Sequence, residues 1–137
     1  MSFLLDTNVL SEARRRQPDG HVKAWLSSVA GADLFTSVLV VGEIRRGVER
    51  LRRRDTAQAT LLDEWLVTLK QQFADRVLPV TMEIAEEWGR LNVPNPLPTI
   101  DGYLAATASI RGLTLVTRDT RDLARTGVAL LDPWTAG

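Results

Sequence analysis

The chain has 137 residues, and its 17 basic and 17 acidic side chains give a formal net charge of zero at pH 7. This length is typical of one domain with a core of its own, so we expect residues 1–137 to form a single domain. The chain contains no cysteine, which excludes disulfide bonds, a thiol nucleophile and cysteine-ligated metal sites.

Hydrophobic periodicity predicts short strands that alternate with helices along the chain. The expected strands cover residues 2–5, 34–36, 77–80, 113–117 and 128–131. The expected helices cover residues 9–16, 22–29, 38–54, 56–73, 83–91 and 100–111, and a short polar turn and helix follow the strand at 113–117. Ser37 and Thr99 can cap helix N-termini, and Gly112 is expected to end the helix before it. The alternation predicts an α/β fold with a mostly parallel central sheet and helices on both faces.

Several other classes of protein do not fit the sequence. No signal peptide and no apolar run of roughly 20 residues is visible, so we expect a cytoplasmic protein without membrane contact. His21, the one histidine, lies in a turn and is expected at the surface. A single histidine excludes a two-histidine zinc site and makes a Ser-His-Asp triad a poor fit.

Two acids follow predicted strands. Asp6 comes directly after the first strand, and Asp119 lies two residues beyond Thr117. Sites in parallel sheets form beyond the carboxyl ends of the strands, so both acids are candidate site residues. A helix cap or an Asx turn explains Asp6 equally well. The residues alone also leave Asp122 nearly as good a candidate as Asp119.

Asp101 lies in the first turn of a predicted helix. It shares a face with Leu104, Ala105 and Ala108, so an acid heads a stripe that is otherwise typical of a packed surface. The helix dipole favours the ionised form of an acid at this position. Charge complementarity at the helix N-terminus is the simpler explanation, but it would not need a packed face.

Glu43 lies beside the apolar stripe of its predicted helix, with Gly42 before it and Gly47 one turn later. Glycine inside a helix costs up to about 1 kcal/mol relative to alanine. We therefore expect another segment of the chain to approach the helix closely there. The alternative is an ordinary glutamate at the boundary between the buried and exposed faces.

Convergence of these acids would require a cation. Two carboxylates about 4 Å apart repel by roughly 4 kcal/mol at an effective dielectric near 20. The two lysines, Lys23 and Lys70, lie far from the acids in the sequence. Hard cations such as Mg²⁺ or Mn²⁺ suit carboxylate ligands, and such a site can activate water for displacement at phosphorus.

Four segments resemble, in chain order, the motifs of PIN-domain nucleases. They are Leu5–Glu12, Val41–Gly47, Ile100–Ala108 and Leu115–Asp119, and the ending Leu131–Trp134 is also similar. The strongest similarity is to VapC-type toxins, in particular the FitB-like subset that carries Asp-Gly-Tyr and Thr-Arg-Asp-Thr. The resemblance spans nearly the whole chain and implies a PIN-like three-layer sandwich.

The resemblance also implies roles for the acids. Asp6 and Asp101 match the positions of direct Mg²⁺ ligands, with Mn²⁺ as an alternative ion. Glu43 and Asp119 match supporting acids that often act through water, which favours Asp119 over Asp122. Thr7 matches a hydroxyl group beside the metal, and helix capping is an equally good explanation for it.

The implied activity is that of an endoribonuclease, acting as the toxin of a type II toxin–antitoxin pair. The implied partners are an RNA substrate and an antitoxin with a DNA-binding domain. The protein is expected to contact DNA only through this antitoxin. The implied assembly is a homodimer.

Two sequence features offer contact surfaces for these partners. The apolar stripe of residues 56–73 offers part of a groove for an antitoxin helix, and core packing explains it equally well. The arginine run from Arg45 to Arg54 offers contacts to an RNA backbone. A solvated helix face with pairs such as Glu49 and Arg53 is the equal alternative.

Three other functions are alternatives to a nuclease. An aspartyl phosphotransferase usually has a second acid two residues after the first, where this chain has Asn8. A receiver domain needs paired acids near the first strand and a late lysine, and neither is in place. A non-catalytic binding or regulatory module, acting through an antitoxin–DNA complex, stays open because it would keep the same acids.

Overall fold

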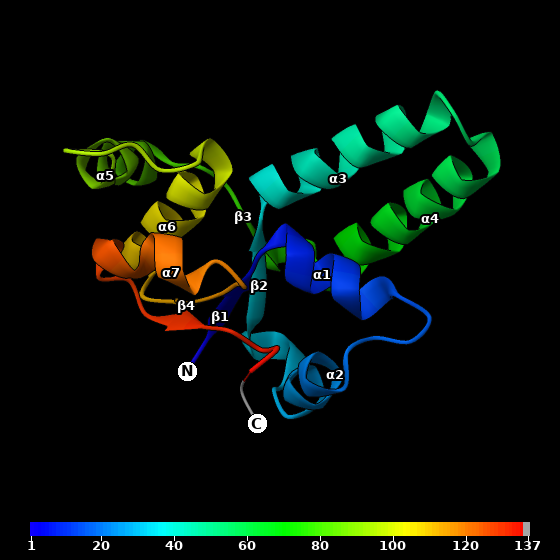
Figure 1. Ribbon diagram of the computed structural model, residues 1–137, viewed down its shortest axis with the longest axis horizontal. Helices are drawn as coiled ribbons and strands as arrows, with labels where there is room; N and C mark the ends of the chain where they lie inside the picture. Colours follow the sequence, from blue (N-terminus) through cyan, green and yellow to red (C-terminus); the bar gives the residue numbers. More distant parts are fainter. Residues whose placement is uncertain (136–137) are drawn as a thin grey trace.

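Short parallel strands form the centre of the molecule (Figure 1). The computed structural model describes residues 1–135. Within them the sheet has five strands in the order β3-β2-β1-β4-β5, and every neighbouring pair is parallel. They are β1 (Phe3–Leu5), β2 (Leu34–Ser37), β3 (Val77–Leu78), β4 (Thr114–Val116) and β5 (Leu130–Leu131). All residues of the central strand β1 are buried, as expected for a strand covered on both faces.

Helices flank the sheet on both sides, with α1 to α4 to the right of the strands in Figure 1 and α5 to α7 to the left. Those in residues 1–135 are α1 (Thr7–Arg14), α2 (Gly20–Ser27), α3 (Val38–Arg52), α4 (Thr56–Phe73), α5 (Met82–Leu91), α6 (Thr99–Arg111) and α7 (Thr120–Leu123). Short 3₁₀ turns cover Gly31–Asp33, Ala74–Arg76 and Ala124–Thr126. No helix among these residues is long and apolar enough to cross a lipid bilayer.

The core lies between the sheet and the inner faces of the helices. Its most deeply buried large side chains, each less than 2% exposed, include Leu4 and Leu5 of β1, Leu66 of α4, Leu104 of α6 and Leu115 of β4. The second half of α3 and the first half of α4 contribute less to this core. Their far ends form a helical hairpin that extends away from the sheet (Figure 1).

Polar side chains determine where several helices begin. Asp6 and Asp19 cap α1 and α2, so both helices start two residues earlier than predicted. The predicted cap of α3 is confirmed, because Ser37 accepts a hydrogen bond from the N–H of Leu39. The predicted Thr99 cap is wrong. Thr99 is already the first residue of α6, and Pro98 occupies the cap position without a side-chain hydrogen bond.

Proline and glycine determine where other elements end. β3 stops at Leu78 rather than Val80, because Pro79 has no N–H to donate to a neighbouring strand. Gly112 ends α6 as predicted, with a φ of 66° in the left-handed region that other residues rarely adopt. The predicted α/β fold with a parallel sheet and helices on both faces is confirmed.

Candidate functional site

The four predicted acids approach one another at the edge of the sheet where the strands end. Asp6 follows β1 and Asp119 follows β4, while Glu43 and Asp101 lie near the starts of α3 and α6. A cavity of about 120 Å³ opens there, lined by Asp6, Thr7, Asn8, Glu43, Asp101 and Leu104. The fold thus brings together acids that are separated by more than a hundred residues in the sequence.

Asp6 is buried, with 4% of its surface exposed. Its carboxylate accepts a hydrogen bond of 2.9 Å from the N–H of Val9 and so caps α1. Burial raises the pKa of Asp6, although hydrogen bonds from Thr117 and Val9 oppose the rise. The charges of Asp119 and Glu43 raise it further. Asp6 therefore caps α1 and lines the cavity at the same time.

Thr117 belongs to this cluster, although its side chain was not among the predicted site residues. It is 1% exposed, its hydroxyl group bonds to Asp6, and its oxygen accepts a 3.1 Å hydrogen bond from the N–H of Asp119. One hydroxyl group therefore fixes two acids relative to each other. The available signal was a hydroxyl residue at the end of a buried strand, two positions before an acid.

Asp101 has the most crowded electrostatic surroundings. Burial raises the pKa of Asp101 to about 6, and the charge of Asp119 and a hydrogen bond with it add to the rise. The charges of Asp6 and Glu43 contribute as well. As predicted, Leu104 and the rest of its stripe are buried, so the acid heads a packed helix face.

The helix that carries Asp101 is held by α5. The ring of Trp88 stacks on Tyr103 with centroids 4.8 Å apart and planes 3° apart. Gly102 allows this approach, because a Cβ there would lie 3.2 Å from Trp88. Packing against Trp88 thus fixes the backbone at Gly102, next to Asp101. This limits the freedom of the Asp101 carboxylate.

Glu43 is positioned by Thr7, whose hydroxyl group donates a hydrogen bond to its carboxylate. Capping of α1 by Thr7 is excluded, since Asp6 provides the cap. The predicted close approach at Gly42 is wrong, because a Cβ there would have no neighbour within 4 Å. At Gly47 the nearest atom, in Leu62 of α4, would lie at an ordinary contact distance of 3.9 Å.

The structure separates the two acids that the sequence left open. Asp119 is partly buried and lies near enough to Asp6 and Asp101 to raise the pKa of both. Asp122 lies in α7 with its side chain exposed. Of the two, only Asp119 therefore joins the cluster.

The chemistry of this donor set fits a hard divalent cation. All candidate ligands are oxygens, and the raised pKa values of Asp6 and Asp101 reflect burial and uncompensated like charge, which a cation would relieve. Within residues 1–135, no three acidic or histidine side chains are arranged to hold a metal ion by themselves. Mg²⁺ does not need such a cage, because it usually binds through one or two carboxylates and several waters.

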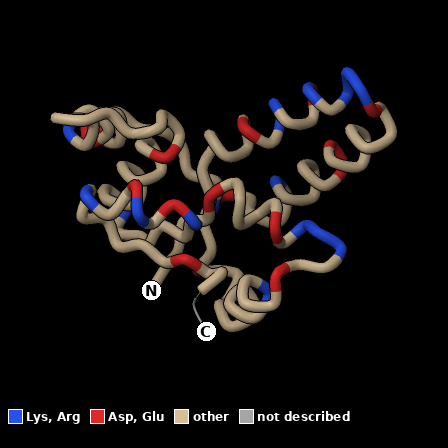
Figure 2. The backbone as a smooth tube through the Cα atoms, in the orientation of Figure 1, with Lys and Arg blue, Asp and Glu red and all other residues tan. Residues whose placement is uncertain are grey.

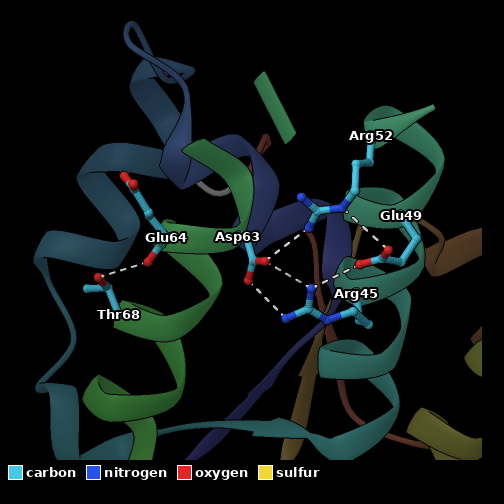
Figure 3. Close-up of polar contacts among 6 residues, drawn as sticks. All are labelled: Arg45, Glu49, Arg52, Asp63, Glu64 and Thr68. Atoms are coloured by element: carbon cyan, nitrogen blue, oxygen red, sulfur yellow. Dashed lines mark hydrogen bonds and ion pairs between the residues drawn. The ribbon is translucent and has the colours of Figure 1, made fainter. Parts of the chain in front are cut away.

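Two arginines of the basic run on α3 form ion pairs with α4 (Figure 3). Arg45 and Arg52 reach across the hairpin to Asp63 of α4, at 2.9 and 3.2 Å. Glu49 pairs with these same arginines, at 3.2 and 3.5 Å, so the predicted pair with Arg53 is not formed. These ion pairs tie α3 to α4.

Two remaining predictions concern α4 and His21. In the apolar stripe of α4, Leu66, Leu69 and Phe73 are buried in the core, while Trp65 is half-buried. Core packing therefore accounts for most of that stripe. His21 is exposed, as predicted.

Comparison with known protein families gives a match that is consistent with the fold and the acid cluster. Residues 3–129 match the PIN domain. The chain belongs to the PIN-domain family. Its relatives include toxin FitB of Neisseria gonorrhoeae, which is 36% identical over 139 residues that cover 96% of this chain and 98% of FitB. The VapC ribonuclease Y4jK of Sinorhizobium fredii is 33% identical over 140 residues, covering 96% and 97% of the two chains.

Solved structures agree with this assignment. The crystal structure of FitAcB from Neisseria gonorrhoeae superposes on this PIN domain with a TM-score of 0.89 and 36% identity. The match covers 97% of this chain and 99% of the other. The predicted family and the PIN-like fold are confirmed.

Proposed function

We propose that this PIN domain is a divalent-metal-dependent endoribonuclease and the toxin of a type II toxin–antitoxin pair. The observation that carries the proposal is the convergence of Asp6, Glu43, Asp101 and Asp119 around one small cavity. The names of FitB, a toxin, and Y4jK, a VapC ribonuclease, support both parts. Residues 1–137 act as a single domain in this proposal.

Asp6 and Asp101 are the proposed direct ligands of Mg²⁺ or Mn²⁺, and Glu43 and Asp119 support the ion through water. When bound, the ion acts as a Lewis acid that activates water and stabilises the charge that develops at phosphorus. The protein orients the acids: Thr117 and Val9 hold Asp6, and Thr7 holds Glu43.

The proposed partners follow from the same assignment. They are an RNA substrate, a second copy of the chain in a homodimer, and an antitoxin whose DNA-binding domain provides the contact with DNA. The proposed place of action is the cytoplasm. A non-catalytic module would use the same partners without turnover, so an activity measurement separates the two functions.

Expression in a bacterial host tests this function. We expect the unmodified protein to arrest growth and cellular RNA to be cut, because nothing inhibits the free toxin. Asp6→Asn removes a charged ligand and should relieve both effects. Asp122→Asn is the matched control, since this exposed acid of α7 lies outside the cluster, and it should arrest growth like the unmodified protein. Equal arrest by Asp6→Asn with intact RNA would instead support the non-catalytic module.

A further inference from the structure

A second cavity, of about 270 Å³, opens beside the carboxylates. It lies between the starts of α3 and α6 and is lined by Val38, Leu39, Gly42, Glu43, Arg46 and Ile100. Glu43 lines both cavities, so the groove begins where the acid cluster ends. Its volume is below the roughly 300–1,000 Å³ of sites for drug-sized ligands, and it suits a group the size of one planar ring system.

The walls of this groove combine apolar surface with one cation. Val38, Leu39 and Ile100 provide aliphatic surface, and Val38 is 42% exposed although it is apolar. Gly42 leaves the middle open, because nothing lies within 4 Å of the position of its missing Cβ. Arg46 supplies the positive charge.

Further arginines continue from the groove along α3. Positions 46, 50 and 53 are spaced four and three residues apart, so Arg46, Arg50 and Arg53 share one helix face with Glu43. In Figure 2 basic residues follow α3 to the tip of the hairpin. Arg45 and Arg52 instead turn to Asp63 (Figure 3). Within residues 1–135, the salt bridges of α3 involve those two arginines and leave Arg46, Arg50 and Arg53 unpaired.

A single-stranded nucleic acid is chemically complementary to this surface. Its bases are planar and apolar on their faces, and its phosphates repeat along the strand as the arginines do along α3. A second copy of this chain fits less well, because its formal net charge is zero, whereas a nucleic acid strand carries one negative charge at every phosphate.

We propose that the groove binds the base of the RNA nucleotide next to the scissile phosphate. Arg46 binds the phosphate of that nucleotide, and Arg50 and Arg53 continue the path of the strand. The inference rests on the ribonuclease function proposed above, and it names a substrate subsite within it.

Filling the groove tests the base contact. Gly42→Leu places a side chain in open space and raises helix propensity, so the fold should be retained. Gly89→Leu in α5 is the matched control, because a Cβ there also meets nothing within 4 Å. Both are made in an Asp101→Asn background to prevent turnover. Binding of a short fluorescein-labelled single-stranded oligoribonucleotide is measured by anisotropy in Mg²⁺. Gly42→Leu should weaken binding about tenfold or more, and the control should not.

Removing the cation tests the phosphate contact. Arg46→Gln should weaken binding and lower the slope of log affinity against log salt by about one, as expected for one lost phosphate contact. Arg111→Gln, at the opposite end of α6 from Asp101, is the matched control and should leave the slope unchanged.

Unchanged affinity in both Gly42→Leu and Arg46→Gln would overturn the proposal. A smaller mass in sedimentation for Gly42→Leu, with unchanged RNA affinity, would also overturn it and assign the groove to a contact between copies. Cleavage by the unmodified protein is measured separately. If RNA binding depends on the groove but the unmodified protein does not cleave RNA, the nuclease function is refuted and the binding role of the groove is retained. If the protein cleaves RNA but binding does not depend on the groove, the nuclease function is retained and the binding role of the groove is refuted.

Discussion

At the start of α6 the Asp101 carboxyl group is partly buried and crowded by three other acids, and burial first and then their charges raise its pKa to about 6, well above the ordinary 3.8. Folding therefore favours the protonated form of Asp101 relative to the unfolded chain. The stabilisation from this protonated group is complete below about pH 4, and it is lost as the pH rises through about 6. Without a cation, the ionised Asp101 should weaken the fold at neutral pH.

Thermal unfolding of the metal-free protein in EDTA can detect this penalty. Asp101→Asn removes the charge, so its melting temperature should exceed that of the unmodified protein by a few degrees at pH 7. The difference should shrink as the pH falls and nearly vanish at about pH 3, because Asp101 is then largely protonated in both the folded and the unfolded state. Mg²⁺ at pH 7 should raise the melting temperature of the unmodified protein only. No dependence of the difference on pH would contradict the crowding of Asp101.

Thr117 is the residue-scale link between Asp6 and Asp119. Thr117→Val keeps the shape but removes the hydroxyl group, which should raise the pKa of Asp6 and destabilise the fold by about 1–3 kcal/mol. Mn²⁺ affinity, measured by calorimetry, should fall by about 10–100-fold, as is typical for groups that orient ligands. Thr107→Val is the control, because this buried hydroxyl bonds only to the carbonyl of Tyr103. Equal Mn²⁺ affinity in both variants would refute this role of Thr117.

At the scale of elements, the α3–α4 hairpin depends on contacts between its own two helices. Asp63 of α4 forms ion pairs with Arg45 and Arg52 of α3. Hydrogen bonds from Arg45 hold the pKa of Asp63 below its ordinary value. Partly exposed pairs of this kind contribute little singly and more as a network. The hairpin is thus fastened on the side that faces α4, which leaves the other face of α3 available.

Asp63→Asn should lower the free energy of unfolding slightly, measured by urea denaturation at low salt. The loss should shrink at high salt, because screening weakens the pairs in the unmodified protein. Glu64→Gln is the neighbouring control: the Glu64 carboxylate is exposed, and its hydrogen bond with Thr68 uses the backbone carbonyl (Figure 3). A salt-independent loss would show that the ion pairs do not stabilise the hairpin.

The type and order of most elements could be predicted, because periodicity and caps are local properties. The first residues of helices were less predictable where a side chain could either cap the helix or lie within it. Asp6 and Asp19 moved two helix starts because they cap, whereas Thr99 had a capping side chain and did not. Hydroxyl groups have several local partners, and the sequence does not rank them.

At the scale of the whole molecule, the sheet determines which acids meet. Asp6 could be placed at the carboxyl edge of the sheet from its strand alone, and Asp101 from its packed stripe. The choice of Asp119 over Asp122 depended on tertiary contacts or on the family resemblance. Gly42 shows the limit most clearly: its small size predicts a closely packed neighbouring segment, and the structure has an open groove there instead.

Cleavage of RNA by purified protein tests the central claim most directly. Purified Asp101→Asn and Asp122→Asn proteins are compared with the unmodified protein on one labelled RNA, in Mg²⁺, in Mn²⁺ and in EDTA. We expect cleavage by the unmodified protein and by Asp122→Asn in either metal, no cleavage in EDTA, and a loss of at least about 100-fold for Asp101→Asn. Full activity of Asp101→Asn, or of the unmodified protein in EDTA, would contradict the metal-dependent carboxylate site.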